Sequence, residues 1–428
     1  MSKREAAGED AGKRDGVGRA LGLGLITGAA DDDCSAIGTY ASAGARFGTD
    51  ILWTAPVTLP MMYAVVYLSS KLGQVSGRGL FHVIKDFYPR WLLWAVLIGV
   101  LIGNTIEAAA DLGGMAAAIG MFVPLPAPLL VAGVAAIIFA LQLYGSYTFI
   151  RNVFRWLALA LLAYVGSAVL AQPDAAAILR GTLVPKAEFS REFLSILVAI
   201  IGTTLSAYLY TWQSNEEVEE EIGKGRTTVE ERKGATAGEL RRSRRDILIG
   251  MTFSNLIMYF IILSTGATLY EAGEHDIETA VQAAEALRPL AGEAAGVLFA
   301  AGIIGVGFLA VPVMTTGAAY DLAQAMGWRH SLHAKPGEAR KFYIVTGVFT
   351  LIAVALNFLG FNPMKALVWS GIVQGFSTPP LLLLILLMTN NRRIMGDHVN
   401  SASTNVLGWV TTVAIFSASI GLIATWFI

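Results

Sequence analysis

Three consecutive aspartates, Asp31, Asp32 and Asp33, interrupt an apolar stretch near the beginning of the chain, within GLITGAADDDCSAIGTYASAG. At the centre of a membrane helix each aspartate costs about 2.5–3.5 kcal/mol on insertion scales, so three together cannot all face lipid. We expect them to face water, a substrate or polar groups of the protein. Small residues on both sides, among them Gly28 and Ser35, suit a local unwinding of the helix.

A second apolar stretch, LVAIIGTTLSAYLYTWQS, is interrupted by small polar residues from Gly202 to Ser206. Exposed backbone N–H and C=O groups at such helix breaks can bind a ligand. The glycines alone could instead serve close helix packing. We predict that both interruptions supply the substrate-binding side chains: Asp32, Asp33, Ser35, Thr203, Ser206, Tyr208, Trp212 and Gln213.

A third apolar stretch carries Asn104, Glu107 and Asp111. Residues four apart lie on one face of a helix, so Glu107 and Asp111 form a common stripe. Buried carboxyl groups can take up and release protons near neutral pH, and we predict that this pair couples transport to protons. Alternatively, one of the two forms an ion pair with Arg151 or Arg155.

The elements that position these residues are membrane helices. Hydrophobic residues make up 55% of the 428 residues and charged residues 15%, against about 25% charged in soluble domains. Apolar runs of about 20 residues suit helices that cross a bilayer, and no alternating pattern of a barrel is present. We predict eleven spans, in chain order: Leu21–Gly44, Thr49–Ser70, Trp91–Met121, Ala127–Tyr144, Tyr147–Ala171, Glu192–Trp212, Ile247–Tyr270, Ala295–Met326, Phe342–Leu359, Lys365–Met388 and Val406–Phe427.

Most of the 31 lysines and arginines fall in the N-terminal tail and in alternate loops. Because cytoplasmic loops are enriched in these residues, the N-terminus is predicted to be cytoplasmic and the C-terminus outside. The polar stretch Met1–Asp15 lacks the features of a secretory signal, so the first apolar segment is kept as a span. The expected location is a prokaryotic inner (plasma) membrane.

The two interrupted spans are the first and the sixth, five apart. Transporters built from two inverted five-helix repeats place broken helices at corresponding positions and bind substrate between them. The expected fold is therefore all-α and polytopic, a leucine-transporter-like 5+5 inverted repeat with an eleventh helix. The predicted segments are a cytoplasmic tail (1–17), a first repeat (18–171), an outer loop (172–190), a second repeat (191–390) with a charged cytoplasmic loop (215–245), and the eleventh-helix segment (391–428).

Several segments resemble the natural-resistance-associated macrophage protein (NRAMP) family of proton-coupled divalent-metal transporters. They are AIGTYASAGARFGTDILW after Asp33, DLGGMAAAIG in the third span, LFAAGIIGVG in the eighth, and NPMKALVWSGIVQGFSTPPLLLLILLMTNNRRIMG from Asn362 to Gly396. The resemblance covers nearly the whole chain in order. It implies the leucine-transporter-like fold with an appended helix.

The chain departs from that family's pattern at the positions to which the resemblance assigns metal binding and proton transfer. The first-span motif Asp-Pro-Gly-Asn reads Asp33-Cys34-Ser35-Ala36, which keeps the acid and loses the amide. The sixth-span motif Met-Pro-His reads Ser206-Ala207-Tyr208, and a further family histidine falls on Gln213. In the third span Asp111 matches an acid of the family's proton route, whereas the glutamate after it is Gly114.

Two substrates remain open. Hydroxyl, amide, carboxylate and aromatic groups together favour a small polar organic solute, urea-, amide- or guanidine-like. The alternative is a hard divalent cation of the Mg²⁺/Mn²⁺ type held by Asp33, because loss of thioether and imidazole leaves oxygen ligands. A channel or a receptor is a third possibility, which an exchange assay would separate.

Other classes of function are disfavoured. No serine–histidine, HExxH or paired-aspartate hydrolase arrangement lies within the predicted spans, so an enzyme is not expected. The single cysteine, Cys34, allows neither an intrachain disulfide nor a multi-cysteine metal site. The expected partners are a solute or cation, protons and the lipid bilayer; neither a cofactor nor nucleic acid is expected.

Overall fold

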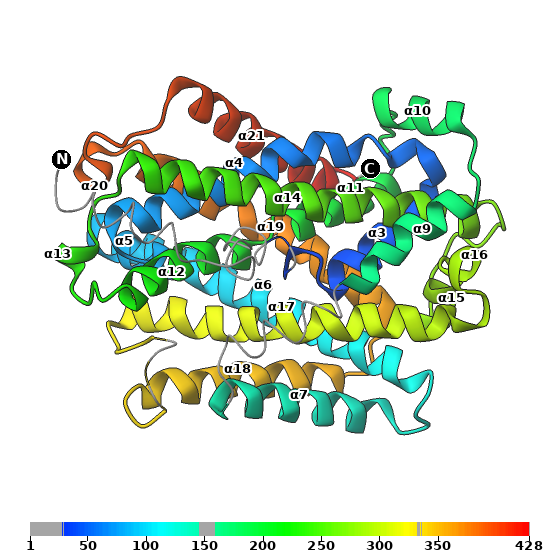
Figure 1. Cartoon of the computed structure of the whole chain (residues 1–428), viewed down its shortest axis with the longest axis horizontal. Coiled ribbons are helices and arrows are strands. Elements are labelled where there is room, and N and C mark those ends of the chain that lie inside the picture. Colours follow the sequence, from blue (N-terminus) through cyan, green and yellow to red (C-terminus); the bar gives the residue numbers. More distant parts are fainter. Residues whose placement is uncertain (1–27, 29, 145–158, 332–333, 335, 428) are drawn as a thin grey trace.

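The computed structural model describes residues 28, 30–144, 159–331, 334 and 336–427, and in these residues all regular structure is helical (Figure 1). The long helices lie side by side along the long axis of the molecule. Eight described segments are long and apolar enough to cross a bilayer. They are α6 (Arg90–Gly120), α7 (Ala127–Tyr144), α11 with α12 (Arg191–Gly223), α14 with η3 (Ala237–Tyr270), the segment Arg288–Met326 that contains α17 (Ala295–Met326), α18 (Arg340–Asn357), α19 (Pro363–Thr389) and α21 (Ala402–Ala424).

The first two predicted spans meet in a sharp turn. Helix α3 (Cys34–Phe47) with η1 (Gly48–Ile51) and helix α4 (Thr54–Ser76) form a pair bent by 116°. Much of the fifth predicted span lies outside the described residues; its described part contains η2 (Leu159–Leu162) and α9 (Ala163–Leu170). The count of eleven spans and the segment boundaries therefore stay predictions.

Two helices extend well beyond their apolar cores. Helix α12 (Ala207–Gly223) continues through the acidic residues after Trp212, and α14 (Ala237–Thr265) begins ten residues before Ile247. At the beginning of α14, Thr236 and Glu239 form a reciprocal capping box that satisfies free backbone N–H groups. The charged loop expected at 215–245 is therefore confined to 224–236, which includes the short α13 (Val229–Arg232).

The short elements gather at the two ends of the bundle (Figure 1). One end carries α13, α5 (Leu80–Phe87) and α20 (Arg392–Met395); the opposite end carries α10 (Ala175–Leu183), α15 (Ala280–Glu285) and α16 (Arg288–Ala291). We call the first the inner end and the second the outer end, because the distribution of basic residues predicts that the first is cytoplasmic.

Helices α11 and α19 pack at backbone distance because α11 has a glycine at the crossing. A Cβ atom added to Gly202 would lie 1.9 Å from the carbonyl oxygen of Gly371 and 2.4 Å from the amide nitrogen of Gly375. Small residues at such crossings allow the backbones of membrane helices to approach closely. This contact holds the sixth span against α19 beside the break in that span.

The Gly202→Ala substitution should therefore lower the free energy of unfolding by about 1–3 kcal/mol, the usual cost of overpacking. Thermal unfolding in detergent, followed by size-exclusion chromatography of the heated protein, measures this loss. Gly133→Ala in α7 is the matched control, since an added Cβ at Gly133 meets nothing within 4 Å. Equal unfolding midpoints for the two variants would contradict the assignment of a tight crossing.

Candidate functional site

The first span is broken at the aspartates. Ala30 and Asp31 are helical, Asp32 and Asp33 are not, and α3 begins at Cys34. Asp33 is the N-cap of α3, and its Oδ1 accepts a hydrogen bond of 2.6 Å from the backbone N–H of Ala36. A carboxylate is favoured there because the N-terminus of a helix carries partial positive charge. The predicted interruption of the first span is confirmed.

The sixth span is broken five spans later, as predicted. Helix α11 (Arg191–Thr204) ends at Thr204, and α12 begins at Ala207. The hydroxyl groups of Tyr210 and Thr378 donate to the carbonyl oxygen of Leu205, which lies in the gap. The break therefore leaves a carbonyl group that side chains, instead of helical backbone, satisfy.

A tyrosine joins the two breaks. The hydroxyl group of Tyr208, in the first turn of α12, lies 2.8 Å from the carbonyl oxygen of Ala30 and 3.1 Å from Asp33 Oδ2. Asp33 and Tyr208 are fully buried. Two of the predicted substrate-binding residues, one from each interrupted span, are thus in direct contact at the centre of the protein.

The stripe on α6 contacts the same centre. Asp111 Oδ1 accepts hydrogen bonds from the backbone N–H (3.0 Å) and the hydroxyl group (2.8 Å) of Ser35. Glu107 Oε1 accepts from the hydroxyl group of Ser206 at 3.1 Å. Each acid of the stripe therefore contacts one of the two breaks. Arg151 and Arg155, the alternative partners, lie outside the described residues.

Helix α19 contributes polar residues that we did not predict. Ser370 donates to Ser35 (2.8 Å), and Gln374 Nε2 donates to Glu107 Oε2 (2.5 Å). Thr378 is the residue that contacts Leu205. The three are spaced four apart, which places them on one face of the helix. This spacing is visible in the sequence and could have indicated the face that lines the centre.

Asp31 and Asp32 turn toward α14. The hydroxyl group of Ser254 donates to Asp31 Oδ2 at 2.6 Å and lies 3.1 Å from Asp32 Oδ1. The remaining oxygens, Asp31 Oδ1 and Asp32 Oδ2, have no hydrogen-bond partner among the described residues. Asp32 is thus buried near the break, but its described hydrogen bond is to α14 and not to α12.

The described hydrogen bonds of Asp33 do not include the last predicted residues, Thr203, Trp212 and Gln213. Gln213 Nε2 donates to Glu217 Oε1 at 2.9 Å, further toward the inner end. Trp212 and Thr203 are buried, and the described hydrogen bonds of Asp33 go to Ala36 and Tyr208. Five residues separate Gln213 from Tyr208, which places the two side chains about 140° apart around α12.

The central carboxyl groups have no basic partner within the described part of the chain. Asp31, Asp32, Asp33, Glu107 and Asp111 are all 0% exposed. No described lysine, arginine or histidine nitrogen lies within 4.0 Å of their oxygens. No group of three or more His, Cys, Asp or Glu side chains in that part converges as a metal site would. Instead, the hydroxyl groups of Tyr208, Ser35, Ser206 and Ser254 form hydrogen bonds to these acids.

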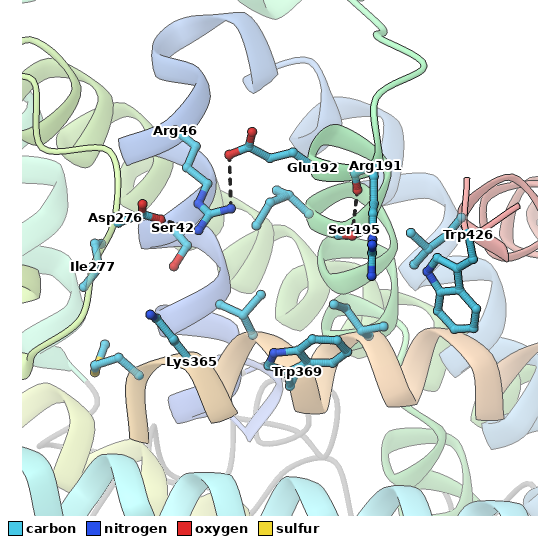
Figure 2. Close-up of a pocket in the computed structure, with 15 residues that line it drawn as sticks. Ser42, Arg46, Arg191, Glu192, Ser195, Asp276, Ile277, Lys365, Trp369 and Trp426 are labelled. Carbon is cyan, nitrogen blue, oxygen red and sulfur yellow. Dashed lines mark hydrogen bonds and ion pairs between the residues drawn. The ribbon is translucent and has the colours of Figure 1, made fainter. Parts of the chain in front are cut away.

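A cavity of about 440 Å³ opens beside the outer halves of α3, α11 and α19 (Figure 2). Arg46, at the outer end of α3, closes toward two acids from other elements: Arg46 Nη1 lies 3.1 Å from Glu192 Oε1, and Nη2 forms an ion pair with Asp276. The indole rings of Trp369 and Trp426 line the other side. Arg46 thereby ties α3 to α11 and to the segment before α15.

Loss of the ion pairs of Arg46 should make the central site more accessible from the outer end. Exposed ion pairs contribute about 0.5–1 kcal/mol, so Arg46→Gln should increase the open population by about two- to fivefold. Cys34 is the only cysteine in the sequence and is 0% exposed, so its rate of alkylation by a membrane-impermeant maleimide measures the opening. Arg288→Gln, which breaks an exposed pair with Glu285 at the same end, is the control. Equal labelling rates would contradict a gate at Arg46.

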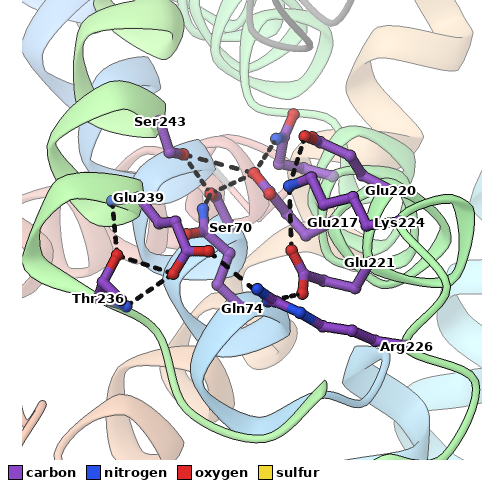
Figure 3. A network of polar contacts seen from close by, with 11 residues as sticks. Ser70, Gln74, Glu217, Glu220, Glu221, Lys224, Arg226, Thr236, Glu239 and Ser243 are labelled. Atoms are coloured by element: carbon purple, nitrogen blue, oxygen red, sulfur yellow. Dashed lines mark hydrogen bonds and ion pairs between the residues drawn. The ribbon is translucent and has the colours of Figure 1, made fainter. Parts of the chain in front are cut away.

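A polar network at the inner end joins α12 to α4 and α14 (Figure 3). The hydroxyl group of Ser70 donates to Glu217 Oε1 (2.6 Å) and lies 2.6 Å from that of Ser243. Lys224 pairs with Glu220 (2.8 Å) and Glu221 (3.1 Å). Burial of Glu217 and its hydrogen bonds make this network a fixed connection between the three helices.

A second set of contacts ties the 224–236 segment to the same helices. Arg226 pairs with Glu221 and lies 3.6 Å from Glu239 Oε1. The backbone N–H of Gly234 donates to the carbonyl oxygen of Val75 at 2.8 Å, and Arg232 Nε donates to that of Gly77 at 3.2 Å. The connection between α12 and α14 therefore lies against the inner end of α4.

The sequence matches the family described as natural resistance-associated macrophage protein-like (Nramp) over residues 24–425. The chain belongs to the Nramp family. It is accordingly a membrane transporter and not an enzyme, as the sequence predicted.

Among curated relatives of this Nramp protein, the divalent metal cation transporter MntH of Deinococcus radiodurans is 29% identical over 403 residues, covering 93% of this chain and 87% of the relative. MntH of Bacillus subtilis is 27% identical over 419 residues, covering 95% and 92%.

Solved structures support the predicted fold of the Nramp chain. The manganese transporter of Eremococcus coleocola, in complex with an aromatic bis-isothiourea compound, superimposes with a TM-score of 0.71 at 18% identity, covering 94% of this chain and 85% of that one. Mhp1, a nucleobase-cation-symport-1 family transporter, gives 0.58 at 13% identity, covering 95% and 92%. The all-α, leucine-transporter-like fold is confirmed.

Proposed function

We propose that this Nramp protein is a proton-coupled secondary transporter of a hard divalent cation of the Mg²⁺/Mn²⁺ type. The observation that carries the proposal is the set of five fully buried central carboxyl groups without a basic partner among the described residues. Buried carboxylates need compensating positive charge, because an uncompensated charge in a medium of low dielectric constant costs several kcal/mol each. A cation and protons supply that charge; a neutral solute does not.

The donor atoms at the centre also favour a hard cation. Asp33 offers a carboxylate, Tyr208 and Ser206 offer hydroxyl groups, and at the breaks the carbonyl groups of Ala30 and Leu205 accept from side-chain hydroxyl groups. Carboxylate, carbonyl and water ligands suit Mg²⁺, Ca²⁺ and Mn²⁺, whereas thioether and thiolate select softer metals. The one thiol, Cys34 Sγ, turns toward the carbonyl oxygen of Ile303 at 3.4 Å.

The acids divide into two roles. In the conformation described, the hydroxyl group of Tyr208 is hydrogen-bonded to Asp33 Oδ2. A cation bound to Asp33 would displace this hydroxyl group and retain several of its own waters. Glu107 and Asp111 then hold the protons, since each contacts one break through a serine hydroxyl group. Cation entry and proton release would thus be linked through Ser35 and Ser206.

The relatives named above are divalent metal cation transporters, and this favours the cation over the organic solute that the residue types first indicated. One observation keeps the solute as a second candidate. In the described residues no three acidic, histidine or cysteine side chains converge on one point, and the aromatic residue Tyr208 contacts Asp33 through its hydroxyl group. A guanidine-like cation would use that pair, with its charge on the carboxylate.

Transport by the purified protein in proteoliposomes tests the proposal. A trapped fluorescent indicator reports entry of Mn²⁺, Mg²⁺ or Ca²⁺, with and without an inward proton gradient, and guanidine and urea are offered as competitors. We expect saturable Mn²⁺ or Mg²⁺ uptake that the proton gradient accelerates. No cation uptake together with saturable guanidine uptake would replace the proposal by the second candidate. Unsaturable flux without counterflow would indicate a channel.

A further inference from the structure

Helix α17 carries a buried carboxyl group that the proposed mechanism does not use. Asp321 lies five residues before the inner end of the helix at Met326 and is 0% exposed. Neither of its oxygens has a hydrogen-bond partner among the described residues, and no described basic nitrogen lies within 4.0 Å of it. A buried aspartate in this state is costly unless a proton or a cation compensates it.

Two residues of α12 face Asp321. The side chains of Thr211 and Asn215 lie next to its carboxyl group without forming a hydrogen bond to it. They are four residues apart and therefore share one face of α12. Asn215 Oδ1 accepts from Gln324 Nε2 at 2.6 Å, whereas Asn215 Nδ2 has no partner in the described part of the chain. Between α12 and α17, the carboxyl group of Asp321 and the side-chain N–H groups of Asn215 thus have no described hydrogen-bond partner.

The inner side of this space is closed by the loop before α5. A Cβ atom added to Gly79 would lie 2.2 Å from Gln324 Nε2 and 2.3 Å from Asn215 Oδ1, so the backbone at Gly79 covers both amides. The backbone N–H of His82 donates to Gln324 Oε1 at 3.1 Å. The Asn215–Gln324 hydrogen bond and α5 therefore separate Asp321 from the inner surface.

The helices that hold Asp321 also reach the central site. On α12, Thr211 follows Tyr208 by one turn, and its hydroxyl group donates to the carbonyl oxygen of Tyr208 at 3.2 Å. On α17, a Cβ atom added to Gly307 would lie 3.1 Å from Cys34 Sγ, which places Gly307 level with the first break. Asp321 follows Gly307 by fourteen residues, or about 21 Å along the helix. It lies between the centre and the inner end.

We propose that Asp321 forms a second cation site, with Thr211 and Asn215, on the inner half of the path between α12 and α17. The occupant is a hard divalent cation, bound by one carboxylate, a hydroxyl group, an amide carbonyl and retained waters. Release of Asn215 from Gln324 frees its carbonyl oxygen for the cation and at the same time opens the contact beneath Gly79. The inference rests on the proposed function, since it assigns a second binding site to the same transported cation.

Isothermal titration of the full-length protein in detergent with MnCl₂, and separately with MgCl₂, tests the second site. We expect two ions per chain for the parent, one for Asp321→Asn, one for Asp33→Asn, and none for the double variant. Asp397→Asn, an exposed acid at the same end, is the control and should keep both. Asn215→Asp adds a charged ligand and should tighten the inner site by about tenfold, or 1.4 kcal/mol. Unfolding midpoints verify that each variant is folded.

The outcomes separate the two proposals. If the parent binds no divalent cation, the proposed function fails and the inner site fails with it. If the parent binds one ion, which Asp33→Asn removes and Asp321→Asn leaves unchanged, the proposed function stands and the inner site is overturned. The same holds if Asp321→Asn alters only proton uptake, because the site then takes a proton only.

Discussion

Replacing Asp33 by asparagine is expected to abolish saturable uptake of Mn²⁺ and Mg²⁺ and to weaken their binding at the centre by about two to three and a half decades. Removing one partner from a buried charge pair costs about 3–5 kcal/mol, and each 1.4 kcal/mol is a factor of ten in affinity. Asparagine keeps an oxygen that accepts from the N–H of Ala36, and its Nδ2 replaces Oδ2 and can donate to the hydroxyl group of Tyr208, which itself can donate to the carbonyl oxygen of Ala30. Uptake in proteoliposomes and calorimetric titration measure the two effects.

Asparagine, unlike alanine, removes the negative charge of Asp33 without removing the N-cap of α3. Asp33→Ala would also remove the N-cap of α3, at a cost of about 1 kcal/mol, whereas asparagine caps helices as well as aspartate does. Asp174→Asn is the matched control because Asp174 is the exposed N-cap of α10, with acceptor bonds to Ala176 and Ala177. Uptake by Asp33→Asn at the parental rate would remove Asp33 from the substrate site.

Replacing Glu107 by glutamine is expected to reduce accumulation of the cation against its gradient by roughly tenfold while binding stays near the parental affinity. Coupling between two sites amounts to about 1–3 kcal/mol, or 5–150-fold, and it disappears when one site no longer titrates. Glutamine keeps a carbonyl oxygen for Ser206, so the contact with the break in the sixth span is retained, whereas its Nε2 replaces the oxygen that accepts from Gln374. Asp111→Asn should behave in the same way through Ser35.

Two measurements on the same vesicles distinguish coupling from binding. The first is the steady-state accumulation under an inward proton gradient, and the second is counterflow, which needs no gradient. We expect Glu107→Gln to lose the first and keep the second. Glu188→Gln, an exposed glutamate at the outer end, should keep both. If both acid variants accumulate the cation as the parent does, the protons travel elsewhere.

Most of the fold could be predicted because lipid imposes simple rules on a helix. The predicted limits of Ala127–Tyr144 and Ala295–Met326 coincide with α7 and α17, since apolar composition alone delimits a helix in the bilayer. The predicted limits were wrong where a helix continues beyond its apolar core. The inner end of α12 and the beginning of α14 are charged, and tertiary contacts and a capping box, not hydropathy, keep them helical.

The centre was predictable in part. Three adjacent aspartates cannot face lipid at mid-span, and the run of small polar residues from Gly202 to Ser206 interrupts the sixth span, so both breaks were indicated by the sequence. The orientation of Gln213 could not be predicted. Its partner Glu217 had been assigned to a loop, and the direction in which Gln213 points became clear only because α12 continues past Trp212. Asp321 escaped notice for a similar reason: near a helix end an acid is ordinary, and only the packing of α12 and α5 against α17 buries it.

The network around Glu217 has a mechanical consequence. Ser70, Ser243 and the segment from Arg226 to Gly234 connect α12 to both α4 and α14. The inner half of the sixth span therefore cannot move on its own. Any displacement that separates α12 from α17 must move these three helices together and must break the hydrogen bonds from Gln324 to Asn215 and from Tyr320 to Glu219. The inner halves of these three helices thus form one rigid block, which α17 holds through Asn215 and Glu219 of α12.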